Sequence, residues 1–359
     1  MKQGKIGRID KIYFIFKEYA EGNNMARADL LEDMHHYAKI YSQIDNAKAG
    51  TDKLNQKLSQ LRTLDSTIAY PFFMAFFDYA SKNDLPESEI CRVIDVIESY
   101  WARRIICNLP SNALNKVFAT LHRDVLNYIG KGLSDNKPTY IDVLTYILLK
   151  KGRSSIFPSD EDVKTDFATR QVYKIPDNNE RHDVVKGLSE KKISIEHIMP
   201  QTLSDQWKND LGPEWERIHQ TYLHTMANLT LTAYNSQYSN LTFLEKRDME
   251  KGFKESAFRL NNYLKSCDKW TEDELKERQK ELLGVFMKLW PMPSTTFKPT
   301  KQEAESASLE DDDFEFTGKK LQAYILYGVR YTVNTWKDML IQVCNHILLK
   351  RRSTIEWLC

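Results

Sequence analysis

The residues with the clearest capacity for chemistry surround the segment Ile195-Glu196-His197-Ile198. Hydrolysis of a phosphodiester needs a base for the attacking water and positive charge at the phosphate and leaving oxygen. A neutral imidazole suits the first task near pH 7, and a divalent cation held by oxygen ligands suits the second. The spacing offers His197 as the base, Glu196 as a carboxylate ligand and Asn235 as an amide ligand. Asn228 would hold the loop or orient His197.

The elements that must position these residues follow from the pattern around them. Residues 192–198 and 228–232 alternate as short strands do, and residues 242–254 have a polar helical pattern. Strand, long loop, strand and helix is the order of a ββα unit. Strict alternation puts Glu196 and His197 on opposite faces, so they converge only at a strand end or bulge. Pro200 indicates that the strand ends there.

Each of these residues also has a purely structural interpretation, and the sequence leaves both open. His197 and Glu196 could be a satisfied core histidine and a surface carboxylate, and Asn228 a turn residue. His224, four residues before Asn228, favours packing or a supporting position beside the site over a ligand. Asn235 could be a helix cap, and Lys246 could lie on a solvated helix face.

The first 150 residues have a different pattern, typical of a helical bundle. Ile90, Ile94, Ile97 and Arg104 recur on one helix face, and the next helix shows the same pattern from residue 114 to 125. Arg103 and Arg104 could contact phosphates, although buried pairing with a carboxylate is the stronger interpretation.

Composition limits the function classes. The 359 residues are 42% hydrophobic and 28% charged, with a net charge of +1, so nucleic-acid binding would have to use local patches. The five scattered cysteines favour free thiols in a reducing compartment over a disulfide framework. With no apolar leader and no apolar stretch long enough to cross a bilayer, we expect a soluble, cytoplasmic protein.

An ordered set of positions extends well beyond the Glu-His pair. It comprises residues 194–201, Trp207, residues 228–232, Asn235, residues 239–240, Phe243 and Lys246. This set resembles the C-terminal nuclease domain of GmrSD-type enzymes, which are modification-dependent (type IV) restriction systems with an HNH, or His-Me finger, nuclease domain. The resemblance covers roughly residues 10 to 350, with further matching stretches at residues 70–72, 103–107, 157–160, Tyr173 and 336–340.

The resemblance implies a role for each matching position. His197 would be the general base, Glu196 the acidic metal ligand, Asn228 the central asparagine and Asn235 the final ligand. Asn240 has the same chemistry as Asn235 and lies close to it. Lys246 would contact a phosphate, and the cofactor would be Mg²⁺ or Mn²⁺, since oxygen ligands favour these over Zn²⁺.

The resemblance also implies an architecture. We expect a mainly α chain with a small α+β insert: a helical region (1–150), a connecting segment (151–192), an HNH-like ββα-metal nuclease domain (193–291), a linker (292–313) and a small C-terminal α/β extension (314–359). Family members begin with a ParB-like NTPase domain with an Asp-Gly-Gln-Gln-Arg motif, which this sequence lacks. A separate NTPase subunit is therefore an expected partner.

The expected function is that of a divalent-metal-dependent endonuclease acting on DNA, including modified phage DNA. The alternative is a non-catalytic C-terminal portion that binds DNA or a partner and depends on a separate NTPase or recognition domain.

Overall fold

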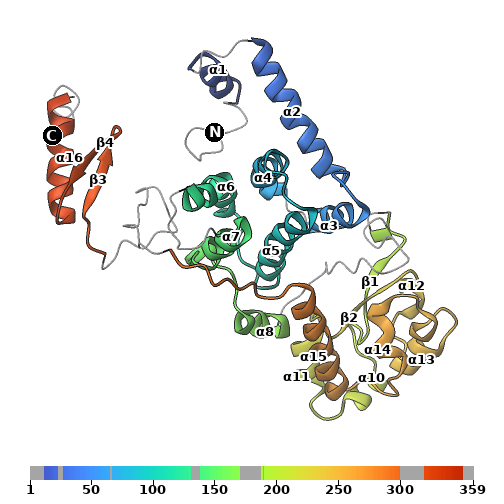
Figure 1. Ribbon diagram of the computed structural model, residues 1–359. Helices are drawn as coiled ribbons and strands as arrows, with labels where there is room; N and C mark the ends of the chain where they lie inside the picture. Colours follow the sequence, from blue (N-terminus) through green and yellow to red (C-terminus); the bar gives the residue numbers. More distant parts are fainter. Residues whose placement is uncertain are drawn as a thin grey trace. The chain divides into compact units, whose positions relative to one another are not determined.

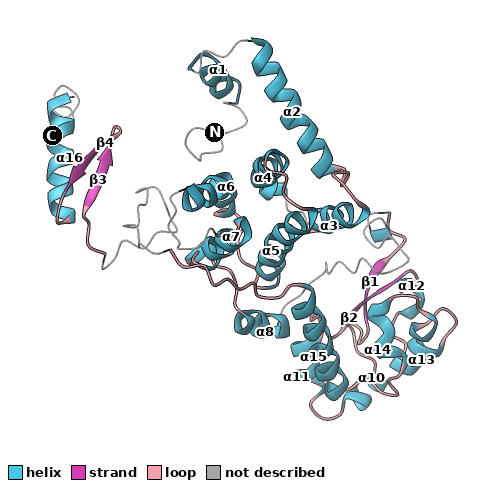
Figure 2. Ribbon diagram, viewed as in Figure 1, coloured by secondary structure: helices cyan, strands magenta, loops and turns pink. Residues whose placement is uncertain are grey.

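The computed structural model describes residues 12–22, 27–64, 67–130, 138–169, 187–188, 190–299 and 319–350. The chain separates into two compact units, Met1–Ala304 and Glu305–Cys359, with their boundary inside the predicted linker. The described part is mainly helical with two small two-stranded antiparallel sheets (Figure 1 and Figure 2), which agrees with the predicted class at this level. The finer divisions at residues 150 and 192 stay predictions.

Helices make up the first half of the larger unit. None of the helices described is long and apolar enough to span a bilayer. In chain order the elements are α1 (Ile12–Gly22), α2 (Arg27–Asp45), α3 (Asp52–Thr63), the 3-10 turn η2 (Thr67–Ala69), α4 (Tyr70–Lys82), α5 (Glu87–Ile106), α6 (Leu114–Gly130), α7 (Tyr140–Leu149), η3 (Arg153–Ser155) and α8 (Asp160–Thr169). The sequence predicts a short helix from Ser159 or Asp160 through Tyr173, and its residues 170–173 lie outside the described residues.

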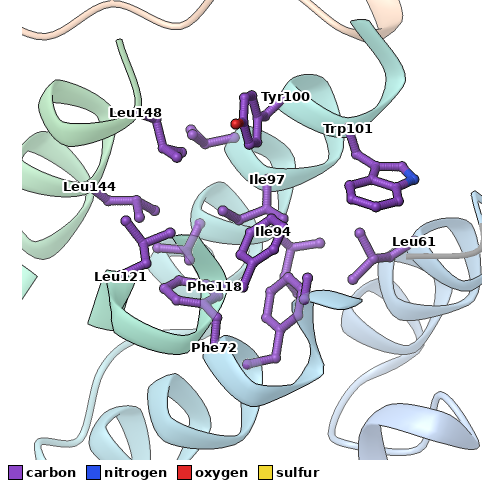
Figure 3. Close-up of a cluster of buried hydrophobic side chains, with 14 of the residues drawn as sticks. Leu61, Phe72, Ile94, Ile97, Tyr100, Trp101, Phe118, Leu121, Leu144 and Leu148 are labelled. Atoms are coloured by element: carbon purple, nitrogen blue, oxygen red, sulfur yellow. The ribbon is translucent and has the colours of Figure 1, made fainter. Parts of the chain in front are cut away.

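The predicted helix α5 is at the centre of this bundle. It begins after Pro86, which is tolerated at a helix start because the first N–H groups have no intrahelical partner. Its Ile94 and Ile97 are fully buried. Figure 3 shows them surrounded by Phe72 of α4, Phe118 and Leu121 of α6, and Leu144 and Leu148 of α7. Burying each such side chain contributes about 1.5–3 kcal/mol, so this cluster accounts for much of the bundle's stability.

The second half of the larger unit contains the predicted strands and a separate core. Trp207 and Trp270 are its largest buried side chains. The elements are β1 (Ser194–His197), α10 (Asp205–Leu211), α11 (Trp215–Tyr222), β2 (Leu229–Thr232), α12 (Asn235–Tyr238), α13 (Phe243–Asp248), η4 (Phe253–Glu255), η5 (Arg259–Asn261), α14 (Asn262–Lys265) and α15 (Glu272–Leu289).

Two helix predictions in this half have different outcomes. The spacing of Thr271 and Glu274 in the sequence predicts a capping box and a helix after Trp270, and α15 confirms both. The helix predicted over residues 242–254 is wrong in its length, because α13 ends at Asp248 and η4 follows. At Gly252 a Cβ atom would lie only 2.6 Å from the carbonyl oxygens of Lys246 and Arg247. The chain therefore folds back tightly there instead of continuing as a helix.

The start of the predicted linker also differs from expectation. Residues 292–299 have no helix or strand, yet Phe297 is buried and its ring packs edge-on against Tyr128 and Tyr146. Met292 packs against the same core. Apolar side chains thus hold this segment on the helical bundle.

In the smaller unit the sequence predicts a strand pair with Gly328 at the turn and a helix from Trp336 through Leu349, and the structure has both elements. β3 (Ala323–Leu326) pairs with β4 (Val329–Thr332), and α16 spans Trp336–Lys350. The turn residues Tyr327 and Gly328 have φ of +51° and +81°. Two-residue hairpin turns favour positive φ at both positions, which explains the glycine.

Candidate active site

Strands β1 and β2 form the ladder that carries the predicted catalytic residues. His197 pairs with Leu229 and Glu196 with Thr230 in antiparallel register. Since successive side chains of a strand point to opposite faces, Glu196 is buried while His197 is half-buried. Glu196 contacts Lys246, whereas His197 contacts His224. The two neighbours therefore face different surroundings and do not converge on one point.

Asn228 is fully buried and connects the end of β1 to the turn before β2. Its side-chain oxygen accepts from the N–H of Met199 at 2.7 Å and from the indole of Trp270 at 3.3 Å. Its amide nitrogen donates to the carbonyls of Met199, at 2.9 Å, and Leu223, at 3.0 Å. A side chain so enclosed cannot touch substrate. Asn228 is placed to hold the loop that follows β1, and its part in the reaction stays a prediction.

The His197 ring lies at the end of β1 and is half-exposed. Its Nε2 is 3.1 Å from Nδ1 of His224, and its Nδ1 is 3.5 Å from the amide nitrogen of Gln201. Burial lowers the pKa of His197 to about 4, with smaller contributions from His224, Lys246 and His219. The ring is therefore neutral near pH 7 and can accept a proton.

Glu196 and Lys246 form a buried ion pair with an Nζ to Oε1 distance of 2.6 Å. Lys246 also donates to the carbonyls of His197, at 2.9 Å, and Ile198, at 3.2 Å. Lys246 is fully buried, so it does not present its ammonium to a phosphate. This corrects its predicted role: Lys246 fixes the strand end that carries His197.

The described side chains show no assembled ligand set for the predicted Mg²⁺ or Mn²⁺. Among them there is no group of three His, Cys, Asp or Glu side chains that could hold a metal ion. An oxygen of Glu196 is held by Lys246. Asn235 begins α12, but its side chain lies outside the description, and Asn240 is exposed. The ligand roles of Glu196 and Asn235 stay predictions.

Arg103 and Arg104 lie in the first core and are almost fully buried. Arg103 pairs with Asp160 at 2.7 Å and donates to the carbonyl of Trp290 at 2.9 Å. Arg104 donates to the carbonyls of Ser154, Ile156 and Pro110. Their predicted contact with DNA is corrected, because buried guanidinium groups that are satisfied by backbone carbonyls cannot reach a phosphate backbone. They instead attach the 153–160 segment to α5.

Two contributors to the site carried little signal in the sequence. His224 was noted for its position before Asn228, but its contact with His197 depends on the turn between α11 and β2. Arg278 of α15 was missed. It is buried and donates to the carbonyls of Met226, Ala227 and Leu229, around the turn that holds Asn228. A cation in an amphipathic helix ordinarily indicates a solvated face, so nothing in the pattern of α15 distinguishes Arg278.

Residues 129–285 match the family described as "GmrSD restriction endonucleases, C-terminal domain". This region of the chain is therefore similar to the GmrSD C-terminal domain. The GmrSD match begins at the end of α6 and ends within α15, so it includes β1, β2, His197, Asn228 and Lys246. A comparison with curated proteins gave no match. The GmrSD resemblance inferred from the ordered motif is confirmed for this region.

Proposed function

We propose that this chain is a DNA endonuclease of the GmrSD, modification-dependent restriction kind, hydrolysing phosphodiester bonds with His197 as general base. The observation that carries the proposal is a neutral, half-exposed imidazole at the end of β1, inside the region similar to the GmrSD C-terminal domain. The antiparallel β1 and β2, followed by α12 and α13, have the element order of an HNH unit and support that assignment.

In the proposed reaction, a ring nitrogen of His197 takes a proton from water as the water oxygen attacks phosphorus. The bond from phosphorus to the leaving deoxyribose oxygen breaks, and that oxygen takes up a proton from solvent. Proton transfer by a positioned side chain contributes about 10²- to 10⁴-fold to a rate. The lowered pKa keeps the proton-accepting form populated near pH 7. Asn228 and Lys246 keep the backbone on either side of the imidazole in place, through bonds to Met199 and to the His197 carbonyl.

A divalent cation, Mg²⁺ or Mn²⁺, belongs to the proposal as a requirement to be tested. It rests on the family resemblance and on Glu196 and Asn235, not on an assembled ligand set. The GmrSD family name likewise supports DNA as the substrate, modified phage DNA included. A ParB-like NTPase subunit as partner and a cytoplasmic location complete the proposal.

The test is cleavage by the purified full chain. Unmodified plasmid and base-modified phage DNA are incubated with Mg²⁺, Mn²⁺ or a chelator, and nicked and linear products are separated on gels. We expect wild-type protein to cleave and His197→Ala to lose at least about 10²-fold of the rate. His35→Ala is the matched control, because His35 is an exposed histidine on α2.

Equal rates for wild type and His197→Ala would refute His197 as the base. Binding of DNA without cleavage, under every metal and with either substrate, would instead favour the alternative of a non-catalytic portion. In that case, cleavage restored by an NTPase subunit would return the catalytic role to this chain.

A further inference from the structure

The pair of histidines His197 and His224 has a geometry that general packing does not require. Nε2 of His197 and Nδ1 of His224 are 3.1 Å apart, a hydrogen-bond distance. The ring planes meet at 80° with centroids 5.1 Å apart, so the rings are edge-on and not stacked. Both rings are partly exposed, whereas Asn228 beneath them is fully buried.

The backbone fixes the position of His224 independently of His197. Thr225, the next residue, donates both its N–H and its hydroxyl to the carbonyl of Tyr222. The carbonyl of Leu223, the preceding residue, accepts from the Asn228 side chain. His224 is thus held between two anchored neighbours, and its ring is a fixed partner toward which His197 can orient.

Only one proton can lie between the two facing nitrogens. If His197 Nε2 carries it, His224 Nδ1 accepts, and the lone pair of His197 Nδ1 is left for another donor. The amide nitrogen of Gln201, 3.5 Å from Nδ1, can only donate, which fits this tautomer. In the opposite tautomer, Nδ1–H of His197 would face the amide hydrogens of Gln201 and the neutral ring would have no free lone pair.

We propose that His224 is a positioning residue that accepts the Nε2–H of His197 and thereby makes Nδ1 of His197 the proton-accepting atom. The proposal rests on the proposed function, in which His197 is the base. The hydrogen bond that one ring nitrogen donates leaves the other nitrogen with its lone pair, and catalytic imidazoles are usually oriented in this way. The long contact with exposed Gln201 is the one that an attacking water would replace.

Three variants at position 224 distinguish this role from packing. His224→Asn places an amide oxygen near the position of Nδ1 and can still accept the proton. His224→Gln places its amide near the position of Nε2, and His224→Ala has no acceptor. With DNA and Mn²⁺ or Mg²⁺ supplied to the full chain, we expect kcat to fall roughly 10- to 100-fold in His224→Ala and His224→Gln, a part of what a general base contributes. His224→Asn should retain most of the rate, and KM should change little in all three.

Wild-type kcat in His224→Ala, or equal losses in His224→Asn and His224→Ala, would overturn the proposal. If His197→Ala itself cleaves normally, the proposed function fails. The tautomer of His197 is then tested by NMR instead of by an activity assay. In ¹⁵N-histidine-labelled full chain, with His197→Ala used to assign the resonances, His197 should show a protonated Nε2 and an unprotonated Nδ1. His224→Asn should preserve this pattern and His224→Ala should give a mixture of tautomers. A protonated Nδ1 in the wild type, or an unchanged pattern in His224→Ala, would refute the inference.

Discussion

Replacing Lys246 with methionine tests how the strand end that carries His197 is held. Methionine preserves most of the side-chain volume, so the main loss is the ammonium that contacts Glu196 at 2.6 Å and two backbone carbonyls. Removing one partner of a buried ion pair costs about 3–5 kcal/mol. At about 1.4 kcal/mol per factor of ten, this corresponds to a rise of roughly 10² to several 10³ in the opening equilibrium of the β1–β2 ladder.

The loss in Lys246→Met should depend on pH. Burial raises the pKa of Glu196, and Lys246 opposes that rise in the wild type. Without Lys246, the folded-state pKa lies further above the unfolded one, so the protonated carboxyl stabilises the fold at low pH and this stability is lost as pH rises. The variant should therefore fall further below wild type at pH 8 than at pH 5.

Hydrogen exchange of peptides that cover β1 and β2 measures this opening directly. The control is Lys276→Met, which removes an exposed partner of Glu272 at 3.2 Å and should cost at most about 1 kcal/mol. The double variant Glu196→Met/Lys246→Met should lose less protection than Lys246→Met, because no buried carboxylate is left unpaired. Wild-type protection in Lys246→Met at both pH values, or a double variant no better than the single one, would refute the reasoning.

Three further predictions concern the same domain and its neighbour. Gly252→Ala should lower the melting temperature, since its Cβ would lie 2.6 Å from two carbonyl oxygens. Gly284→Ala, with open space around it in α15, should instead stabilise the protein by about 0.5–1 kcal/mol. Equal effects of the two variants in calorimetry would contradict this. Asn228→Ala leaves the Met199 N–H and the Trp270 indole without an acceptor, so the unfolding free energy in urea should fall by at least about 2 kcal/mol; an unchanged midpoint would count against it. Arg103→Met should lower the melting temperature but leave the salt dependence of DNA binding unchanged, and a shallower slope would restore Arg103 as a phosphate contact.

The sequence predicted the elements around the site better than the contacts within it. Alternation predicted that Glu196 and His197 occupy opposite faces, and the register of β1 and β2 agrees. It could not show that Glu196 meets Lys246, since a pairing across 50 residues depends on how α13 packs. Periodicity was more informative for Arg104, which shares the apolar face of Ile94 and Ile97 and is buried as they are.

The residues that sequence reasoning missed act through backbone carbonyls. Arg278 binds carbonyls around a turn, and such acceptors exist at every position of a chain, so no residue type marks its partner. His224 differs, because its position before Asn228 was noted in the sequence but its partner was not. Its hydrogen bond still depended on a turn whose shape is set by Asn228 and Thr225.

Helix α15 connects the two cores of the larger unit. Near the middle of α15, Arg278 donates to a carbonyl in the turn that carries Asn228. Two helical turns later, Phe286 is buried among the residues of the helical bundle. These eight residues of continuous helix span about 12 Å. Beyond its end, Trp290 donates to Glu98 and accepts from Arg103. A displacement of the helical bundle would therefore act through α15 on the turn that carries Asn228.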